Sequence, residues 1–121
     1  MAKRVIMAGR HDDAQNEKLY SMISNNGYDT FKAYDGRMAL DEMERRKPDL
    51  LVTGIGMPKM DGLKLVEEMG KAGLQIPVFL VSYAGDPRLT VDFEYKGKIK
   101  YFRKPFTEGE EIEFLGEMEK L

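Results

Sequence analysis

Three short runs of the chain are apolar on successive residues, and this pattern constrains the fold more than any other feature. They cover residues 5–8, 50–53 and 77–82, and the first two end at Gly9 and Gly54. A strand that is apolar on both faces needs cover on both sides, which is typical of parallel sheets with helices on either face. The runs therefore predict strands of a buried parallel sheet.

The segments between these runs carry apolar residues at helical spacing. The first helix is expected to begin after Asp12 or Asp13, either of which can cap it, and to end near Gly27. Residues 107–110 match a capping box for the last helix, and strands are expected at residues 28–34 and 99–103. Strands and helices therefore alternate, which predicts an α/β fold of (βα)5 type. We expect one domain over residues 1–121, with a doubly wound five-stranded parallel sheet.

Residues 86–97 fit this scheme least well. Thr90, Val91, Phe93 and Tyr95 are poor helix formers, and Pro87 can start a helix but cannot sustain one. The fourth helix is therefore expected to be short or irregular.

The composition limits the functions open to the chain. Hydrophobic residues make up 42% and charged residues 33%, which predicts a soluble folded protein. The 19 basic and 21 acidic residues give a formal net charge of -2, so no general attraction to nucleic acid or to an anionic membrane is expected. The apolar run near the N-terminus is too short for a signal peptide or a membrane span, and there is no cysteine. We expect a cytoplasmic protein that binds neither nucleic acid nor membrane.

Two motifs follow strands at their carboxyl ends. Residues 57–62 read Met-Pro-Lys-Met-Asp-Gly, and residues 104–106 read Lys-Pro-Phe. Together with Ser82 at a strand end and an aromatic residue three positions before the lysine, Tyr101, these motifs make the chain resemble a response-regulator receiver domain, chemotaxis-regulator-like, over its whole length. The resemblance implies a flavodoxin-like sheet with strand order 2-1-3-4-5 and a cis bond before Pro105.

The departures from the family pattern fall on the residues that carry its chemistry. In the family an aspartate after the third strand accepts the phosphoryl group, and Gly54 occupies that position here. The family's acidic pair after the first strand helps to bind a divalent metal, and this chain has Gly9 and Arg10 there, or Arg10 and His11 in the other register. Tyr83 stands where the family has a small residue, and it is expected to plug part of the pocket.

These departures remove what phosphorylation needs. Phosphoryl transfer to a carboxylate requires an ionised oxygen in line with the phosphorus and a cation that neutralises the developing charge. Gly54 has no nucleophile. A divalent ion about 4 Å from Arg10 would suffer roughly 8 kcal/mol of repulsion at an effective dielectric of about 20, whereas a millimolar site is worth only about 4 kcal/mol. We therefore expect no metal, no cofactor and no catalytic residue.

The nearby acids and the single histidine, His11, are candidates to replace the missing groups. Asp12 and Asp13 lie close enough to reach the pocket, although helix capping explains at least one of them more simply. Asp61 suits a turn before a glycine, and His11 suits a surface position. Lys104 can pair with Asp12 or Asp13 without taking part in chemistry.

The favoured hypothesis is a module of two-component (phosphorelay) signalling that binds signalling proteins without phosphorylation and is not an enzyme. The alternatives are an active phospho-acceptor built on non-standard acidic residues or His11, and a sensor that binds an anion or other ligand near Arg10, Lys104 and Ser82. The partner's identity, the pathway and the oligomeric state stay open. The resemblance implies that partners bind a surface formed by the fourth helix, the fifth strand and the last helix. The residues of this output face are Tyr95, Lys98, Lys100, Tyr101, Glu110, Glu113 and Glu117.

Overall fold

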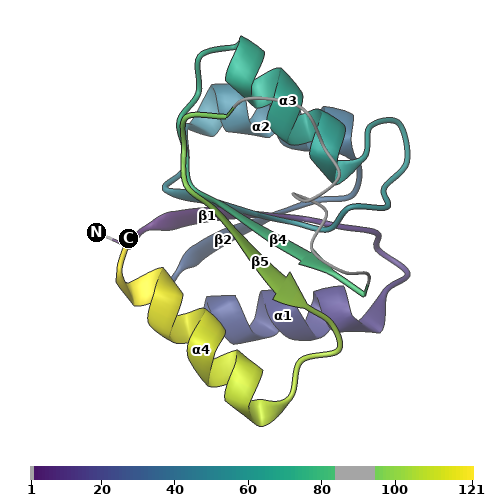
Figure 1. The fold of residues 1–121 in the computed structure, drawn as a ribbon. Helices are drawn as coiled ribbons and strands as arrows, with labels where there is room; N and C mark the ends of the chain where they lie inside the picture. The colour runs from purple at the N-terminus through teal and green to yellow at the C-terminus, as the bar shows by residue number, and fades with distance from the viewer. Residues whose placement is uncertain (1, 84–94) are drawn as a thin grey trace.

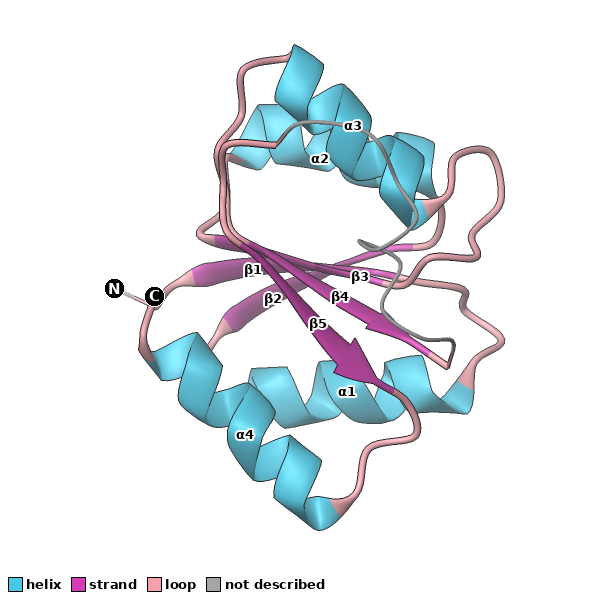
Figure 2. Cartoon of the chain, viewed as in Figure 1, coloured by secondary structure: helices cyan, strands magenta, loops and turns pink. Residues whose placement is uncertain are grey.

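A computed structural model describes residues 2–83 and 95–121 of the chain. Its five strands form one sheet between two layers of helices (Figure 1). Helices α2 and α3 cover one face and helices α1 and α4 cover the other (Figure 2). In chain order the elements are β1 Arg4–Ala8, α1 Ala14–Asn25, β2 Asp29–Ala33, α2 Gly36–Arg46, β3 Leu50–Thr53, α3 Gly62–Lys71, β4 Val78–Ser82, β5 Ile99–Arg103 and α4 Glu108–Glu119.

The sheet has the expected order, β2-β1-β3-β4-β5, and all four strand pairs are parallel. The chain proceeds outward from β1 to β2 and then returns to the other side of β1 with β3. In open α/β sheets, the carboxyl ends of strands at such a reversal form a crevice, because the following loops diverge to opposite faces. The predicted fold class is therefore confirmed, and the reversal identifies where a site is to be sought.

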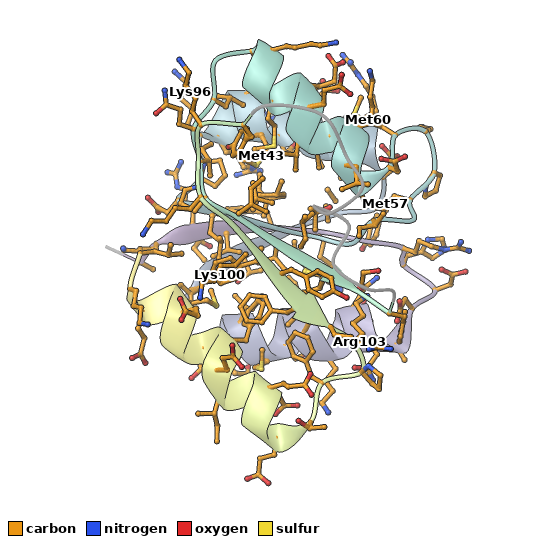
Figure 3. The ribbon with its side chains drawn as sticks, viewed as in Figure 1. Met43, Met57, Met60, Lys96, Lys100 and Arg103 are labelled. Atoms are coloured by element: carbon orange, nitrogen blue, oxygen red, sulfur yellow. The ribbon has the colours of Figure 1, made fainter. Side chains whose placement is uncertain are left out.

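Alternate residues of the strands supply two separate cores. Ile6 and Ala8 of β1 pack in the layer of α2 and α3, whereas Val5 and Met7 pack in the layer of α1 and α4. This alternation is why the runs are apolar on every residue, since each face of each central strand is covered. In Figure 3, Met43 lies between the sheet and the layer of α2 and α3.

Side-chain caps fix the helix starts. Asp13, rather than Asp12, caps α1 by accepting from the Gln15 N–H. Thr107 caps α4 by accepting from the Glu110 N–H, as the capping box predicted. Asp61 was predicted to serve a turn, but it is the N-cap of α3. The predicted turn is wrong because the helix begins at the glycine that follows.

One predicted strand has different bounds, and one predicted helix falls mostly outside the described residues. The strand predicted at residues 28–34 is two residues shorter, because β2 covers Asp29–Ala33. Most of the short or irregular fourth helix predicted at residues 86–97 lies outside the described residues. The helix predicted as the last and fifth is α4. In the parts of the chain that the structure describes, no helix has the length and apolar character that crossing a bilayer requires.

Two aspartate–glycine steps bring backbone into close contact around the loop after β3. A Cβ atom added at Gly62 would lie 2.0 Å from the carbonyl oxygen of Gly54, and one added at Gly36 would lie 2.0 Å from that of Met60. The Gly62 N–H donates to the Ile55 carbonyl at 2.8 Å. The start of α3 is thus held directly against the end of β3, where no side chain fits between them.

This contact predicts a large cost for Gly62→Ala. The new Cβ must displace backbone, so the variant should lose about 1–3 kcal/mol of unfolding free energy in urea denaturation. Gly116→Ala is the matched control, because its Cβ enters open space within α4. Removing a mid-helix glycine should add about 0.5–1 kcal/mol. Equal effects of the two changes would contradict the close approach.

Candidate functional site

An open pocket of about 620 Å³ lies at the carboxyl edge of the sheet. We call it the edge pocket. Four strands bring their ends or following loops to it, as expected for the reversal of strand order between β1 and β3. Its lining comprises residues 9–10, 12–16, 54–56, 81–83 and Lys104.

Gly54 is the first residue after β3 and forms part of the pocket floor. Its N–H donates to the Ala8 carbonyl at 2.9 Å, so the backbone is fixed against β1. The Thr53 hydroxyl donates to the Gly54 carbonyl at 2.8 Å. A Cβ atom at Gly54 would find its nearest neighbours 3.9 Å away, at the carbonyl oxygens of Ala8 and Val81. The position therefore has room for a side chain but carries none.

The position of Gly9 is different, because Asn16 fills the space beside it. A Cβ atom at Gly9 would lie 2.6 Å from the Asn16 side-chain nitrogen. That nitrogen donates to the Arg10 carbonyl at 3.0 Å. The sequence reading missed Asn16, although a signal existed: it shares the buried stripe of α1 with Leu19 and Ile23.

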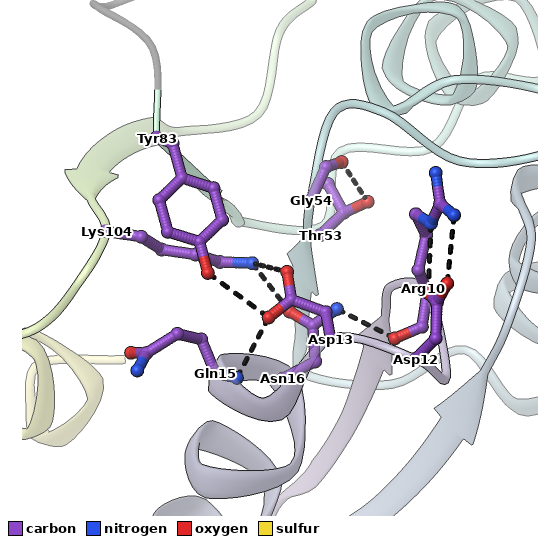
Figure 4. Close-up of polar contacts among 9 residues, drawn as sticks. All are labelled: Arg10, Asp12, Asp13, Gln15, Asn16, Thr53, Gly54, Tyr83 and Lys104. Atoms are coloured by element: carbon purple, nitrogen blue, oxygen red, sulfur yellow. Dashed lines mark hydrogen bonds and ion pairs between the residues drawn. The ribbon is translucent and has the colours of Figure 1, made fainter.

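The ammonium of Lys104 lies inside the edge pocket with its own partners (Figure 4). Its side chain is 5% exposed. It donates to the side-chain oxygen Oδ1 of Asn16 at 2.7 Å and to Asp13 Oδ2 at 3.3 Å. Asp13, and not Asp12, is therefore the acidic partner of Lys104. A buried ammonium needs such acceptors, because transferring it from water into the protein without a partner costs several kcal/mol.

Asp13 joins three structural elements through one carboxylate. Besides capping α1 and pairing with Lys104, its Oδ1 accepts from the Tyr83 hydroxyl at 3.2 Å. Burial by itself would raise the pKa of the Asp13 carboxyl, but the Gln15 N–H, the Lys104 ammonium and the Tyr83 hydroxyl hold that pKa below its ordinary value. Burial and the Asp13 carboxylate raise the pKa of the Tyr83 phenol, so it stays protonated and donates.

Tyr83, the expected plug, lines the pocket from the end of β4. Its side chain crosses toward α1, and the Lys104 ammonium lies 5.2 Å from its ring centre. The residue is 52% exposed, and the pocket keeps its volume of about 620 Å³ beside it. The restriction of ligand entry into the edge pocket by Tyr83 stays a prediction.

Arg10 forms a surface pair with Asp12 at the pocket rim. Two guanidinium nitrogens donate to the two Asp12 oxygens, both at 3.0 Å, and both side chains are more than half exposed. His11 is not among the lining residues; its ring packs edge-on against Tyr34 at 5.8 Å. Across residues 2–83 and 95–121, no three carboxylate, imidazole or thiol groups lie together in a way that could hold a metal ion.

The remaining motif residues meet at the ends of β4 and β5. Ser82 lines the edge pocket, and its carbonyl accepts from the Lys104 N–H at 2.8 Å and from the Tyr101 hydroxyl at 3.4 Å. Tyr101 is therefore turned toward β4. The bond between Lys104 and Pro105 is cis, as the resemblance implied.

Only some of the residues predicted for the output face are exposed and could contact a partner protein. Tyr95 is half-buried, packs on the core of α2 and α3, and donates its hydroxyl to the Ile76 carbonyl. Burial raises the pKa of Tyr95 to about 12. Lys100 pairs with Glu117 at 3.1 Å, which joins β5 to α4. Lys98 and Glu113 are exposed, whereas Tyr101 and Glu110 are partly buried.

Comparison with known proteins decides the family. The profile of the response regulator receiver domain matches residues 11–115 of this chain of 121 residues. The chain belongs to the response regulator receiver family. Both motifs that carried the resemblance lie within the matched part of this receiver domain.

Individual relatives agree. The receiver domain is 30% identical over 88 residues to sporulation initiation phosphotransferase F of Bacillus subtilis (strain 168), which covers 73% of this chain and 71% of that protein. It is 33% identical over 101 residues to response regulator MprA of Mycobacterium leprae (strain TN), covering 84% of this chain and 44% of that protein. The receiver domain of Francisella response regulator 1452 has a TM-score of 0.79 at 25% identity, covering 98% of this chain and 97% of that one. The chain thus spans less than half the length of MprA.

The ion pairs of the edge pocket predict that replacing Asp13 lowers the free energy of unfolding more than replacing Asp12 does. Asp13→Asn keeps a capping side chain but removes the carboxylate from buried Lys104, so it should cost about 1–3 kcal/mol of unfolding free energy at pH 7. Asp12→Asn, the control, breaks only an exposed pair and should cost much less. Urea denaturation measures both.

The pH dependence follows from the lowered pKa of Asp13. Because the folded pKa lies below the unfolded one, the carboxylate stabilises the fold above the unfolded value of about 3.9, and this stabilisation is lost as pH falls through the folded pKa. The difference between wild type and Asp13→Asn should therefore shrink in that acidic range. A difference that persists there would contradict the charge pairing.

Proposed function

We propose that this receiver domain is a phosphorylation-independent interaction module of two-component signalling, with no catalytic activity of its own. It would bind signalling proteins constitutively rather than in response to a phosphoryl group. The observation that carries the proposal is Gly54 at the place where the family pattern puts the acceptor aspartate, directly after β3.

The surroundings of Gly54 support the proposal, because the charges there are already compensated. Lys104 pairs with Asp13, and Arg10 pairs with Asp12. Magnesium in proteins relies on one or two carboxylates whose oxygens are open to the ion. Here both nearby carboxylates accept from cations within the chain, so a metal would have to compete with Arg10 and Lys104 for their oxygens.

The contacts of Tyr101 support constitutive binding. A ligand shifts a conformational equilibrium only by its difference in affinity for the two states. Without a phosphoryl group, no such ligand would draw Ser82 toward another state. The Tyr101 hydroxyl already donates to the Ser82 carbonyl. The output face would then hold one dominant arrangement set by packing.

The proposal predicts that acetyl phosphate with magnesium leaves the intact mass of the protein unchanged. Gly54 offers no oxygen to phosphorylate, and Asp13 is held by three donors. A positive control adds the missing carboxylates through Gly9→Asp, Arg10→Asp and Gly54→Asp, combined with Asn16→Ala to open the space beside residue 9.

Gly54→Asp alone is the matched test of the metal site. Its side chain fits the open position, but metal ligands would still be lacking, so it should phosphorylate poorly. A stoichiometric phosphate on the wild-type protein would overturn the proposed function. Rapid phosphorylation of the single variant would show that the metal site is intact.

The proposal also predicts how a partner binds, once one is captured with this domain as bait. Tyr101→Ala should weaken binding by about 2 kcal/mol, roughly thirtyfold, if the ring anchors the output face. Lys71→Ala, at the exposed end of α3, should leave the affinity unchanged. Calorimetry should give the same values with and without acetyl phosphate and magnesium. Binding that appears only with the phosphodonor would contradict constitutive binding.

A further inference from the structure

Some hydrogen-bond donors of the edge pocket have no acceptor among the described residues. An ammonium has three N–H donors, and Lys104 uses two of them, on Asn16 and Asp13. Ile55 and Gly56 also line the pocket, and their N–H groups meet no acceptor among residues 2–83 and 95–121. Apart from the contact of Lys104 with the Tyr83 ring, three donors therefore lack a hydrogen-bond acceptor within the described protein.

Each carboxylate oxygen of the pocket accepts at least one hydrogen bond from the chain. Both oxygens of Asp12 accept from Arg10. Oδ1 of Asp13 accepts from the Gln15 N–H and the Tyr83 hydroxyl, and Oδ2 accepts from Lys104. A cation entering the pocket would compete with Arg10 and Lys104 for these oxygens, whereas an acceptor group would meet donors that have no acceptor among the described residues. The site is therefore suited to an anion.

The space for this anion is next to Gly54. An added Cβ there has no neighbour closer than 3.9 Å, and Lys104 extends into the same pocket from β5 (Figure 4). The Lys104 side chain is 5% exposed, so water screens its charge weakly. A group with two oxygens can bridge the ammonium and a backbone N–H in this space.

The charge of Asp13 selects among anions. Its carboxylate lies 3.3 Å from the Lys104 nitrogen, so any anion on that nitrogen also meets Asp13. Coulomb repulsion grows with the charge of the incoming group, which disfavours a phosphate dianion relative to a singly charged carboxylate.

We propose that the edge pocket binds one carboxylate group beside Gly54, held by Lys104 and the N–H groups of Ile55 and Gly56. The group belongs to a free organic acid or to an acidic side chain of a protein partner. In the second case the inference rests on the proposed interaction function and specifies it: the partner supplies the carboxylate that position 54 lacks.

The test is a titration of the wild-type protein with sodium acetate at pH 7, at constant ionic strength in sodium chloride, followed by amide chemical shifts. The shifts of Ile55 and Gly56 should saturate, with a Kd on the order of 10 mM, as expected for a few hydrogen bonds to a charged group. Inorganic phosphate should bind more weakly than acetate.

Two variants address the two halves of the site. Lys104→Met removes the ammonium at similar length, and Gly54→Asn fills the space with a neutral side chain. Each should weaken acetate binding by at least about tenfold. Gly116→Ala, far away on α4, should bind like wild type. If Lys104→Met does not fold, Gly54→Asn still decides the matter.

Shifts that do not saturate, or that persist in Gly54→Asn, would overturn the carboxylate site, and so would tighter binding of phosphate. A short capped peptide with one glutamate distinguishes the sources. If it binds at least as tightly as acetate, the carboxylate belongs to a protein chain; if only acetate binds, it belongs to a small acid. Failure of the titration while a captured partner still binds without phosphodonor would refute the site and leave the proposed function intact.

Discussion

The buried ammonium of Lys104 holds the carboxyl edge of this sheet together. It extends from the end of β5 and bonds to Asn16 and Asp13 at the start of α1. Asp13 in turn accepts from Tyr83 at the end of β4. Because a buried ammonium must keep its acceptors, these three elements are fixed relative to one another. The shape of the edge pocket follows from this constraint.

The same contacts explain how a receiver fold accommodates Gly54. The buried charge of Lys104 needs a counterion, and Gly54 supplies none. Asp13 provides it from the first turn of α1, and Asn16 fills the space beside Gly9. Gly9 and Gly54 thus carry no carboxylate, whereas a cation lines the pocket together with residues whose N–H groups meet no acceptor among residues 2–83 and 95–121. This balance favours binding an acceptor group over binding a metal.

Much of the fold could be predicted because it depends on local patterns. Runs that are apolar on every residue gave the central strands and the bounds of β3, since covered strands need no polar face. The bounds of β5 were also predicted, although this strand carries Lys100 and Arg103 and is not an apolar run. Capping side chains gave the start of α4. Asp61 was misread because an aspartate before glycine serves a turn and a helix start equally well. The strand order came from the family resemblance rather than from the residues alone.

The sequence by itself determined which chemical groups this protein has: a glycine after β3, no acidic pair after β1, one lysine before Pro105, and two adjacent aspartates near the start of α1. Only the tertiary structure decided how those groups pair. Asp13 rather than Asp12 meets Lys104, Arg10 turns to Asp12, and Asn16 enters the site. The contacts of Lys104 with Asp13 and Asn16 depend on distances of a few ångströms between residues about 90 positions apart, set by how α1 and β5 pack on the sheet. No local sequence pattern encodes that packing.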